Sequence, residues 1–335
     1  MKLSLLSSLA LLLLAFASGA YLYWRWEVEP LPIGPQALDV EIVPGESLRH
    51  VAQQFQEKGV LPHAWDLVAY ARLHEAAGGL RAGEYRIESG LTVAGLLALL
   101  RSGKVVMHSL TLVEGWTFKQ ALAAVEQEPN LQHSLAGLDS HGMMQRLGFD
   151  AASPEGLILP DTYQFPRGTS DVAFLRRAHE ASDQALDAVW AGRAKDLPYK
   201  SPYDALIMAS IIEKETGQAA ERGKIAGVFV RRLQKGMKLQ SDPTVIYGLG
   251  DSYNGDITLK DLRTDTPYNS YTRYGLPPTP ICLPGRASLD AAVHPEAGNA
   301  LYFVARGDGT HEFSATLVQQ NAAVAKYQLK HGNPP

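Results

Sequence analysis

A long apolar run near the N-terminus constrains this chain more than any other feature. Twenty-two uncharged residues separate Lys2 from Arg25, and leucine is the most frequent among them. As an α-helix rising about 1.5 Å per residue, the run measures about 33 Å, which is enough to cross the hydrocarbon core of a bilayer. Its last part contains aromatic residues typical of a membrane interface: Tyr21, Tyr23, Trp24 and Trp26. We therefore expect residues 1–27 to form a cytoplasmic end and a transmembrane anchor.

The same run also fits a cleaved secretory signal, since Ala15-Phe16-Ala17 offers a small-x-small cleavage site. We favour the retained anchor, because the apolar run continues past this site and ends in aromatic residues. Lys2 and the amino terminus carry positive charge before the run, which favours a cytoplasmic N-terminus. In either case we expect the residues after about 27 to be exported.

Composition excludes several classes of function for the exported part. A chain of 335 residues exceeds what one compact core usually needs, so we expect two domains. The 31 basic and 35 acidic residues leave no basic excess for nucleic acid. The single cysteine, Cys282, excludes an intramolecular disulfide and a multi-thiolate metal site, and the histidines lack an H-E-x-x-H pairing. We expect no cofactor, no bound metal and no nucleic-acid partner.

A short pattern recurs three times after a proline-containing linker at residues 28–36. At 44–48, 89–93 and 114–118, a glycine suited to a turn is followed two residues later by a Ser or Thr that can cap a helix. Alternating strand patterns precede the first two copies. Residues 37–125 thus resemble one or more LysM-like modules, which are small βααβ units that bind N-acetylated glycans. A plain α+β domain that only positions the rest is the alternative.

The clearest helix lies in the larger C-terminal part. We divide that part into a connecting helical region, 126–150, and a mixed α+β domain, 151–330. Ser201 is a suitable N-cap with Pro202 at the first helical position, and Gly217 ends the helix. The residues between are apolar on nearly all sides, which predicts a buried helix. The fold class we predict is α+β, with an N-terminal transmembrane helix, a small module and this larger domain.

Two glutamates, Glu213 and Glu215, occupy the last turn of this helix. A carboxylate there faces the negative end of the helix dipole and loses water to the neighbouring core, and both effects raise its pKa. A glutamate that stays protonated near neutral pH is what general-acid cleavage of a glycosidic bond requires. The two side chains point about 200° apart, so they cannot serve one site together. Periodicity does not separate them, and solvated residues at a frayed helix end are the alternative.

Five tyrosines fall within residues 247–274, among amide and hydroxyl side chains: Tyr247, Tyr253, Tyr268, Tyr271 and Tyr274. Sugar rings offer apolar faces fringed by hydroxyls, so a polysaccharide site combines aromatic rings with polar partners. Half-buried rings that hold long loops together are the other interpretation.

Several blocks in this order closely resemble the YceG-like family of endolytic murein transglycosylases. They are residues 155–163, 209–216, 239–248, 268–272, 275–278, 294–295 and 301–304. One departure is the aliphatic Leu157-Ile158-Leu159, where the family often has aromatic residues. That departure argues against ring stacking by this block.

The resemblance implies a lytic transglycosylase that cleaves the bond between N-acetylmuramic acid and N-acetylglucosamine in nascent peptidoglycan strands and leaves 1,6-anhydro ends. It maps the catalytic carboxyl to Glu215, which precedes Thr216. By resemblance, the supporting substrate contacts are Glu155, Tyr163, Gln240, Ser241, Asp242, Thr244, Tyr247, Tyr268, Asn269, Tyr271 and Thr272. It further implies peptidoglycan synthases (penicillin-binding proteins) as partners, and a single-pass inner-membrane protein with a periplasmic catalytic domain.

Other functions stay open at this point. A non-catalytic, membrane-anchored glycan-binding scaffold would tolerate loss of Glu215. A peptidoglycan glycoside hydrolase would need a second carboxylate, for which Asp242 or Glu155 would serve. An amidase or peptidase is disfavoured, and we interpret Cys282 as a bystander in a proline-rich loop. A basic run could attract anionic stem peptides, although a solvated helix face explains it better: Arg222, Lys224, Arg231, Arg232, Lys235 and Lys238.

Overall fold

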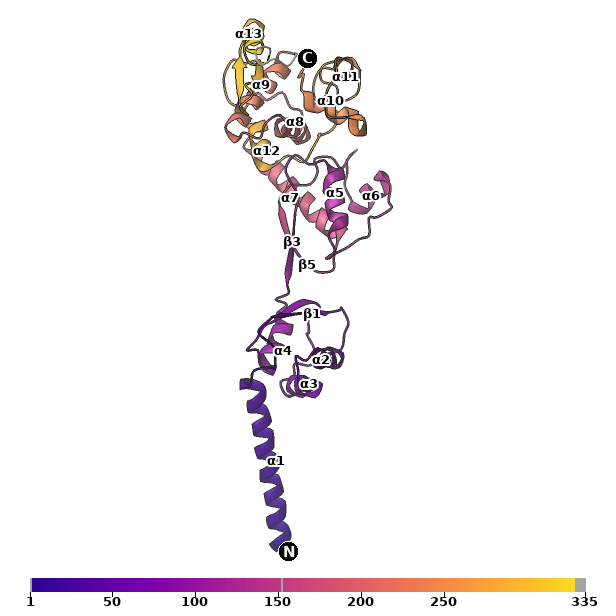
Figure 1. Cartoon of the computed structure of the whole chain (residues 1–335), viewed down its shortest axis with the longest axis vertical. Coiled ribbons are helices and arrows are strands. Elements are labelled where there is room, and N and C mark those ends of the chain that lie inside the picture. The colour runs from indigo at the N-terminus through magenta and orange to yellow at the C-terminus, as the bar shows by residue number, and fades with distance from the viewer. Residues whose placement is uncertain (1, 152, 329–335) are drawn as a thin grey trace. The chain divides into compact units, whose positions relative to one another are not determined.

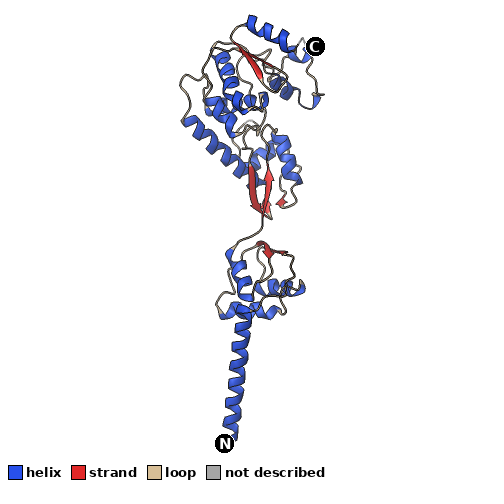
Figure 2. Cartoon of the chain, turned by 60° about the vertical axis from the view of Figure 1, so that its left-hand side comes forward, coloured by secondary structure: helices blue, strands red, loops and turns tan. Residues whose placement is uncertain are grey.

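A computed structural model describes residues 2–151 and 153–328. The chain divides into two compact units, one of residues 1–108 with 164–168 and one of residues 109–163 with 169–335. Helices predominate in both units, and the strands form short two-stranded ladders (Figures 1 and 2). This mixture is the α+β class expected from the sequence.

The first unit begins with helix α1, Lys2–Val28. Within it, Ser7–Val28 is long and apolar enough to span a membrane, as the sequence predicts. The rest of the unit contains β1 (Leu38–Ile42), α2 (Leu48–Glu57), α3 (Ala64–Leu73), β2 (Gly83–Ile87) and α4 (Val93–Ser102). Strands β1 and β2 pair antiparallel, with Leu38 opposite Ile87. The order β1-α2-α3-β2 is the βααβ order expected for this region.

Local sequence rules explain where these helices begin. The hydroxyl of Ser47 accepts a hydrogen bond from the His50 amide at the start of α2, and that of Thr92 accepts one from the Gly95 amide at the start of α4. Each side chain satisfies an amide that has no partner within its helix. The glycines before them, Gly45 and Gly90, have positive φ angles of 89° and 90°, as the turns require.

The end of α1 is part of the core of the first unit. Trp26 is buried, and Leu22 packs against the same cluster. The indole of Trp26 and the guanidinium of Arg25 both donate hydrogen bonds to the buried Asp66 of α3, at 2.6 and 2.7 Å. A buried carboxylate is tolerated only when it is paired in this way. The apolar helix is therefore fixed to the module that follows it.

The boundary between the units falls within β3 (Met107–Thr111) and β5 (Thr162–Pro166), which pair with each other. Residues 109–125 group with the second unit, earlier in the chain than the division we expected at residue 125. The third copy of the strand-turn-helix pattern thus lies in the second unit. There Thr117 and Gln120 form the predicted capping box at the start of α5 (Phe118–Gln127).

The second unit is mainly helical. Besides α5 it contains β4 (Leu131–Gln132), α6 (Ser140–Leu147), β6 (Thr169–Ser170), α7 (Asp171–Ala191), α8 (Pro202–Glu215), η1 (Ala219–Glu221), α9 (Arg222–Gln234), α10 (Asp242–Leu249), η2 (Gly250–Ser252), α11 (Leu259–Arg263), α12 (Arg286–Val293), β7 (Tyr302–Ala305), β8 (His311–Ser314) and α13 (Leu317–Tyr327). β7 and β8 pair antiparallel, and β4 and β6 pair parallel.

Helix α8 forms the centre of this unit, as its composition predicts. The Ser201 hydroxyl caps it by accepting from the Asp204 amide, and residues 205–212 are all buried. Helices α7, α9, α10 and α12 all pack against it. Such a wholly apolar helix is stable only when neighbours cover every side of it. The arrangement places the charged last turn of α8 at the edge of a dense core.

Candidate active site

Glu215 is the last residue of α8, and Thr216 caps that end in an extended conformation. The side chain of Glu215 is partly exposed, although it directly follows the buried apolar helix. The hydroxyl of Ser241 donates a hydrogen bond of 2.6 Å to Glu215 Oε1. One carboxyl oxygen is thus held by a protein group, at a point where the chain meets solvent.

Burial raises the pKa of Glu215 to about 7. The Ser241 hydrogen bond acts in the opposite direction because it stabilises the charged form, the nearby Asp242 carboxylate raises the pKa further, and the Arg232 guanidinium lowers it. The group therefore exchanges its proton near neutral pH. That property is the one a residue needs to act first as an acid and then as a base.

A polar network beneath Glu215 fixes Ser241. The Ser241 amide donates to the Ser270 hydroxyl at 2.9 Å, and Thr244 Oγ1 donates to the Ser241 carbonyl at 2.7 Å. Gln240, just before, has a positive φ of 53° and donates its amide to the Ser270 carbonyl. These contacts hold Ser241 at the start of α10, where its hydroxyl meets Glu215.

Glu215, Ser241, Asp242 and Tyr271 form one polar cluster, in which Asp242 and Tyr271 lie toward the solvent. The Tyr271 hydroxyl donates a 2.5 Å hydrogen bond to Asp242 Oδ1. Burial, followed by the hydrogen bond to Asp242, raises the pKa of Tyr271 well above its ordinary value, so the phenol stays protonated. The cluster thus joins α8, α10 and the loop before residue 275.

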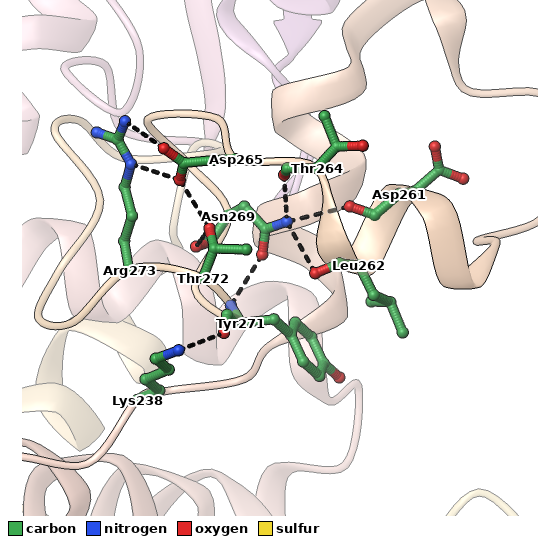
Figure 3. A network of polar contacts seen from close by, with 9 residues as sticks. All are labelled: Lys238, Asp261, Leu262, Thr264, Asp265, Asn269, Tyr271, Thr272 and Arg273. Atoms are coloured by element: carbon green, nitrogen blue, oxygen red, sulfur yellow. Dashed lines mark hydrogen bonds and ion pairs between the residues drawn. The ribbon is translucent and has the colours of Figure 1, made fainter.

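Asn269 organises that loop from within (Figure 3). Its Nδ2 donates to the carbonyls of Asp261, Leu262 and Thr264, and its Oδ1 accepts from the Tyr271 amide. The Asp265 carboxylate accepts from Arg273 and Thr272, and Lys238 donates to the Tyr271 carbonyl. Asn269 is 1% exposed. Its amide serves the loop, which argues against the direct substrate contact that we expected from it and, likewise, from Thr272.

A second carboxyl group with a raised pKa lies in a different setting. Glu155 is 5% exposed and accepts from the Phe118 amide at 2.9 Å and from the Tyr247 hydroxyl at 3.1 Å. Burial raises the pKa of Glu155 to about 7, against the effect of these hydrogen bonds. The Tyr247 ring packs edge-on against Tyr268, whose hydroxyl bonds to Thr279. Glu155 therefore joins α5 to α10 and offers almost no surface to a substrate.

Two further expected residues are buried as well. Thr244 is fully buried, and Tyr163 is 8% exposed with its hydroxyl bound to the Leu159 carbonyl. Their hydroxyls are engaged by the protein, so both support the fold at their positions. Of the residues expected around the catalytic carboxyl, Ser241, Asp242 and Tyr271 are joined to Glu215 by a chain of contacts, with Gln240 and Thr244 as supports.

The other glutamate of the last turn, Glu213, has a different partner. Its Oε2 accepts a 3.0 Å hydrogen bond from the Gly285 amide, and its Oε1 lies 3.9 Å from Arg222. The side chain is 7% exposed. Glu213 thus connects α8 to the start of α12, and the divergent directions of the two glutamates are as the helical geometry requires.

Arg232 was missed as a site residue, and the expectation of a solvated basic face is wrong for it. The side chain is buried, with Nε donating to the Leu301 carbonyl at 2.6 Å and Nη1 to the Leu239 carbonyl at 2.5 Å. Its neighbour Arg231 binds the Ala300 and Glu296 carbonyls. Lys224 and Lys235 of the same run are exposed. The alternation of charged and apolar residues along α9 gave no signal that one arginine faces inward.

Among residues 2–151 and 153–328, no group of three or more His, Cys, Asp or Glu side chains could hold a metal ion. Cys282 is fully buried, and burial raises the pKa of its thiol well above the ordinary value. A buried, protonated thiol is a poor nucleophile. Glu215 is the carboxyl group of this site that is partly exposed and whose pKa is raised to about 7.

The site thus has a partly exposed carboxyl group with a pKa of about 7, and it lies on an α+β domain that follows an apolar helix. Such a carboxyl group is typical of enzymes that use acid–base catalysis. The model of the YceG-like family matches residues 40–326, so the chain belongs to that family. The endolytic murein transglycosylase of Bacillus subtilis (strain 168) is 30% identical over 327 residues, covering 92% of this chain and 90% of that protein.

Two other relatives agree with this membership. The endolytic murein transglycosylase of Streptococcus pneumoniae serotype 2 (strain D39) is 27% identical over 344 residues, covering 89% of this chain and 60% of that protein. A solved structure of a yceG-like protein from Listeria monocytogenes superposes with a TM-score of 0.54 at 31% identity, covering 86% of this chain and 99% of that one.

Proposed function

We propose that this protein is an endolytic peptidoglycan transglycosylase, a lyase that cleaves within glycan strands. The observation that carries the proposal is the carboxyl of Glu215, whose pKa is raised to about 7 at the end of a buried helix. Relatives that match most of the chain are named endolytic murein transglycosylases. Glycan strands of peptidoglycan are accordingly the substrate.

The reaction needs one carboxyl group in two protonation states. Protonated Glu215 gives its proton to the glycosidic oxygen as the bond from C1 of N-acetylmuramic acid breaks, and N-acetylglucosamine leaves with a free hydroxyl. The resulting carboxylate takes the proton from the C6 hydroxyl of the same muramic residue. O6 then bonds to C1 and closes the 1,6-anhydro ring. Because nucleophile and electrophile belong to one sugar, neither water nor a second acid is required.

The neighbours of Glu215 suit this cycle. Ser241 holds one carboxyl oxygen and leaves the other for the substrate. The buried Arg232 lowers the pKa of Glu215 while burial and Asp242 raise it, which keeps both protonation states accessible near pH 7. We assign positioning roles to Thr244, Gln240 and Asn269, and substrate contacts to Asp242 and Tyr271.

Tyr274 is the tyrosine best placed to stack against a sugar ring. It is 70% exposed, and the Lys238 ammonium lies 5.1 Å from its ring centroid. Lys238 also binds the Tyr271 carbonyl (Figure 3), so one lysine contacts both Tyr274 and the loop that carries Tyr271. Tyr247 and Tyr268 are partly buried against each other and suit loop packing better.

A hydrolase is less well supported. It needs a second carboxylate facing the scissile bond. Glu155 has both oxygens engaged inside the protein, and Asp242, next to Ser241 in the chain, is bound by Tyr271. A non-catalytic scaffold would not need a carboxyl group poised at neutral pH.

We further propose that α1 anchors the protein in the inner membrane with its N-terminus in the cytoplasm and the second unit in the periplasm. The charge before the apolar run and its aromatic end support this orientation. The βααβ order of the first unit supports a LysM-like module that holds the glycan strand. Peptidoglycan synthases are the partners that such a location would supply.

Mass spectrometry of released muropeptides tests the function. The full-length protein in detergent is incubated with purified glycan strands, beside Glu215→Gln and Glu213→Gln. Wild type and Glu213→Gln are expected to release fragments with 1,6-anhydro-muramic ends, while Glu215→Gln releases none. Reducing muramic ends from the wild type would overturn the lyase assignment, and equal release by Glu215→Gln would overturn the catalytic role assigned to that residue.

A further inference from the structure

A groove of about 750 Å³ lies in the first unit, outside the candidate active site. It is lined by the end of α3, one face of α4 and the segment between α3 and β2: Tyr70, His74, Ala76, Gly79, Leu80, Arg81, Ala94, Leu97, Ala98, Arg101 and Ser102. None of these residues is acidic. Its lining combines apolar side chains with two arginines and a histidine.

Contacts along α3 show which end of the groove faces α1. Near its start, the ring of Trp65 lies 5.7 Å from that of Trp26. Just past its end, the ring of His74 lies 5.9 Å from that of Tyr23, one turn earlier in α1. Helix α3 therefore runs antiparallel to α1. Its last residues, and the groove beside them, point back toward the apolar part of α1.

The charged residues of α1 indicate where the groove lies relative to the bilayer. Neither Lys2 nor Arg25 belongs in hydrocarbon, and Arg25 is tied to Asp66 of the first unit. The hydrocarbon core takes about 20 helical residues, so it ends just before Arg25. Tyr23 then lies at the membrane interface, and His74 lies beside it. Leu73, which precedes His74 and is 62% exposed, also lies near the membrane interface.

A buried tyrosine joins the backbone segments that carry the two arginines. The hydroxyl of Tyr85, which is fully buried, donates to the carbonyls of Arg81 and Leu100, and the Arg81 amide donates to the Leu100 carbonyl at 3.1 Å. The backbones that carry Arg81 and Arg101 are thereby joined. Both arginines line the same groove, so an anion bound there is attracted by two positive charges.

We propose that this groove binds the headgroup of an anionic phospholipid in the bilayer that α1 crosses. Arg81 and Arg101 bind the phosphate, and the apolar lining residues Leu80, Ala94 and Leu97 receive the glycerol and the first part of an acyl chain. The occupant is a membrane lipid because the groove adjoins the end of the membrane helix and pairs basic with apolar surface. Bound lipid holds the first unit in one orientation against the membrane. This inference rests on the proposed anchoring role of α1.

Native mass spectrometry of the full-length protein in detergent tests the groove. Phosphatidylglycerol and phosphatidylcholine with matched acyl chains are titrated against the wild type, Arg81→Glu, Arg101→Glu and the control Arg49→Glu, which changes an exposed arginine of α2. The wild type and the control are expected to bind one phosphatidylglycerol in preference to phosphatidylcholine. Arg81→Glu and Arg101→Glu are each expected to weaken phosphatidylglycerol binding by about tenfold or more.

Equal affinity for the two lipids, or unchanged phosphatidylglycerol binding in both groove variants, would overturn the proposal. Inorganic phosphate that competes at the same concentration as the lipid would show a phosphate site and overturn the lipid assignment. Extraction of membranes with alkaline carbonate tests the anchor separately: release of the wild type would contradict the anchor, whereas the titration reports on the groove itself.

Discussion

Glu215 and Glu155 have a similar pKa in very different surroundings. Burial raises both to about 7. Glu155 is 5% exposed, and each of its oxygens accepts a hydrogen bond from the protein. Glu215 is partly exposed, and Ser241 is its one hydrogen-bonding side chain within the part of the chain that the structure describes.

The difference teaches that a raised pKa alone does not define a catalytic acid. Both groups would exchange a proton near neutral pH, yet Glu215 is partly exposed whereas Glu155 is buried with both oxygens bound. In Glu155 the same burial serves structure, because the carboxyl links the first amide of α5 to Tyr247 of α10. Substitutions at the two positions should therefore separate activity from stability.

The largest expected effect is on the rate of glycan cleavage. Glu215→Gln keeps the shape of the side chain but removes the transferable proton. We expect the cleavage rate to fall about 1,000-fold or more, as loss of a general acid–base group does. Glu155→Gln should keep the rate within about tenfold of the wild type. Quantifying anhydro ends over time for the two variants measures this contrast, and a comparable loss in both would remove the distinction.

The next effect concerns stability. Glu155→Ala leaves the buried Phe118 amide without its partner, removes one of two partners of the Tyr247 hydroxyl, which also bonds to Thr279, and opens a cavity. An unsatisfied buried group alone costs about 1–3 kcal/mol. We expect the free energy of unfolding of the second unit to fall by about 2–4 kcal/mol. Urea unfolding of the full-length protein in detergent measures it. The exposed Glu126→Ala is the control and should change little; an equal loss there would point to a general effect.

Ser241→Ala should change the pH profile of cleavage. The Ser241 hydrogen bond stabilises the ionised form of Glu215 and lowers its pKa, so its loss raises that pKa further. In the wild type, activity that depends on protonated Glu215 should decline as the pH rises through about 7. In the variant this decline should begin at a higher pH, with a maximal rate about tenfold lower. A profile that keeps its position would show that Ser241 does not contact the Glu215 carboxyl in solution.

Local sequence rules predicted much of this fold and one half of the site. The caps at Ser47, Thr117 and Ser201, and the buried body of α8, follow from residues within a few positions of each other. The placement of Glu215 at the helix end follows from the same rules. These features depend on backbone hydrogen bonds and helical periodicity, which short stretches of sequence determine.

The rest of the site depends on contacts between distant segments. Ser241 meets Glu215 across 26 positions, and Tyr247 meets Glu155 across 92. No local pattern distinguishes Arg232, which turns inward, from exposed basic residues on the same helix. The family resemblance implied a substrate contact for Asn269, yet its amide donates to the carbonyls of its own loop. Tertiary packing decides which of these side chains are buried and which partners they bind.

The smallest expected effect is the pH dependence of stability due to Glu155. Its pKa is about 4.5 in the unfolded chain and about 7 in the folded protein, so between these values the folded state binds the extra proton. The contribution of Glu155 is therefore fully present below about pH 4.5 and is lost as the pH rises to about 7.

The variant Glu155→Gln has no titratable group at this position and serves as the reference. The melting temperature of the wild type relative to this variant should fall by a few degrees between pH 5 and pH 8, as scanning calorimetry of the protein in detergent can measure. A difference that stays constant or grows with pH would mean that Glu155 is ionised throughout, which would remove the similarity in pKa between the two carboxyl groups.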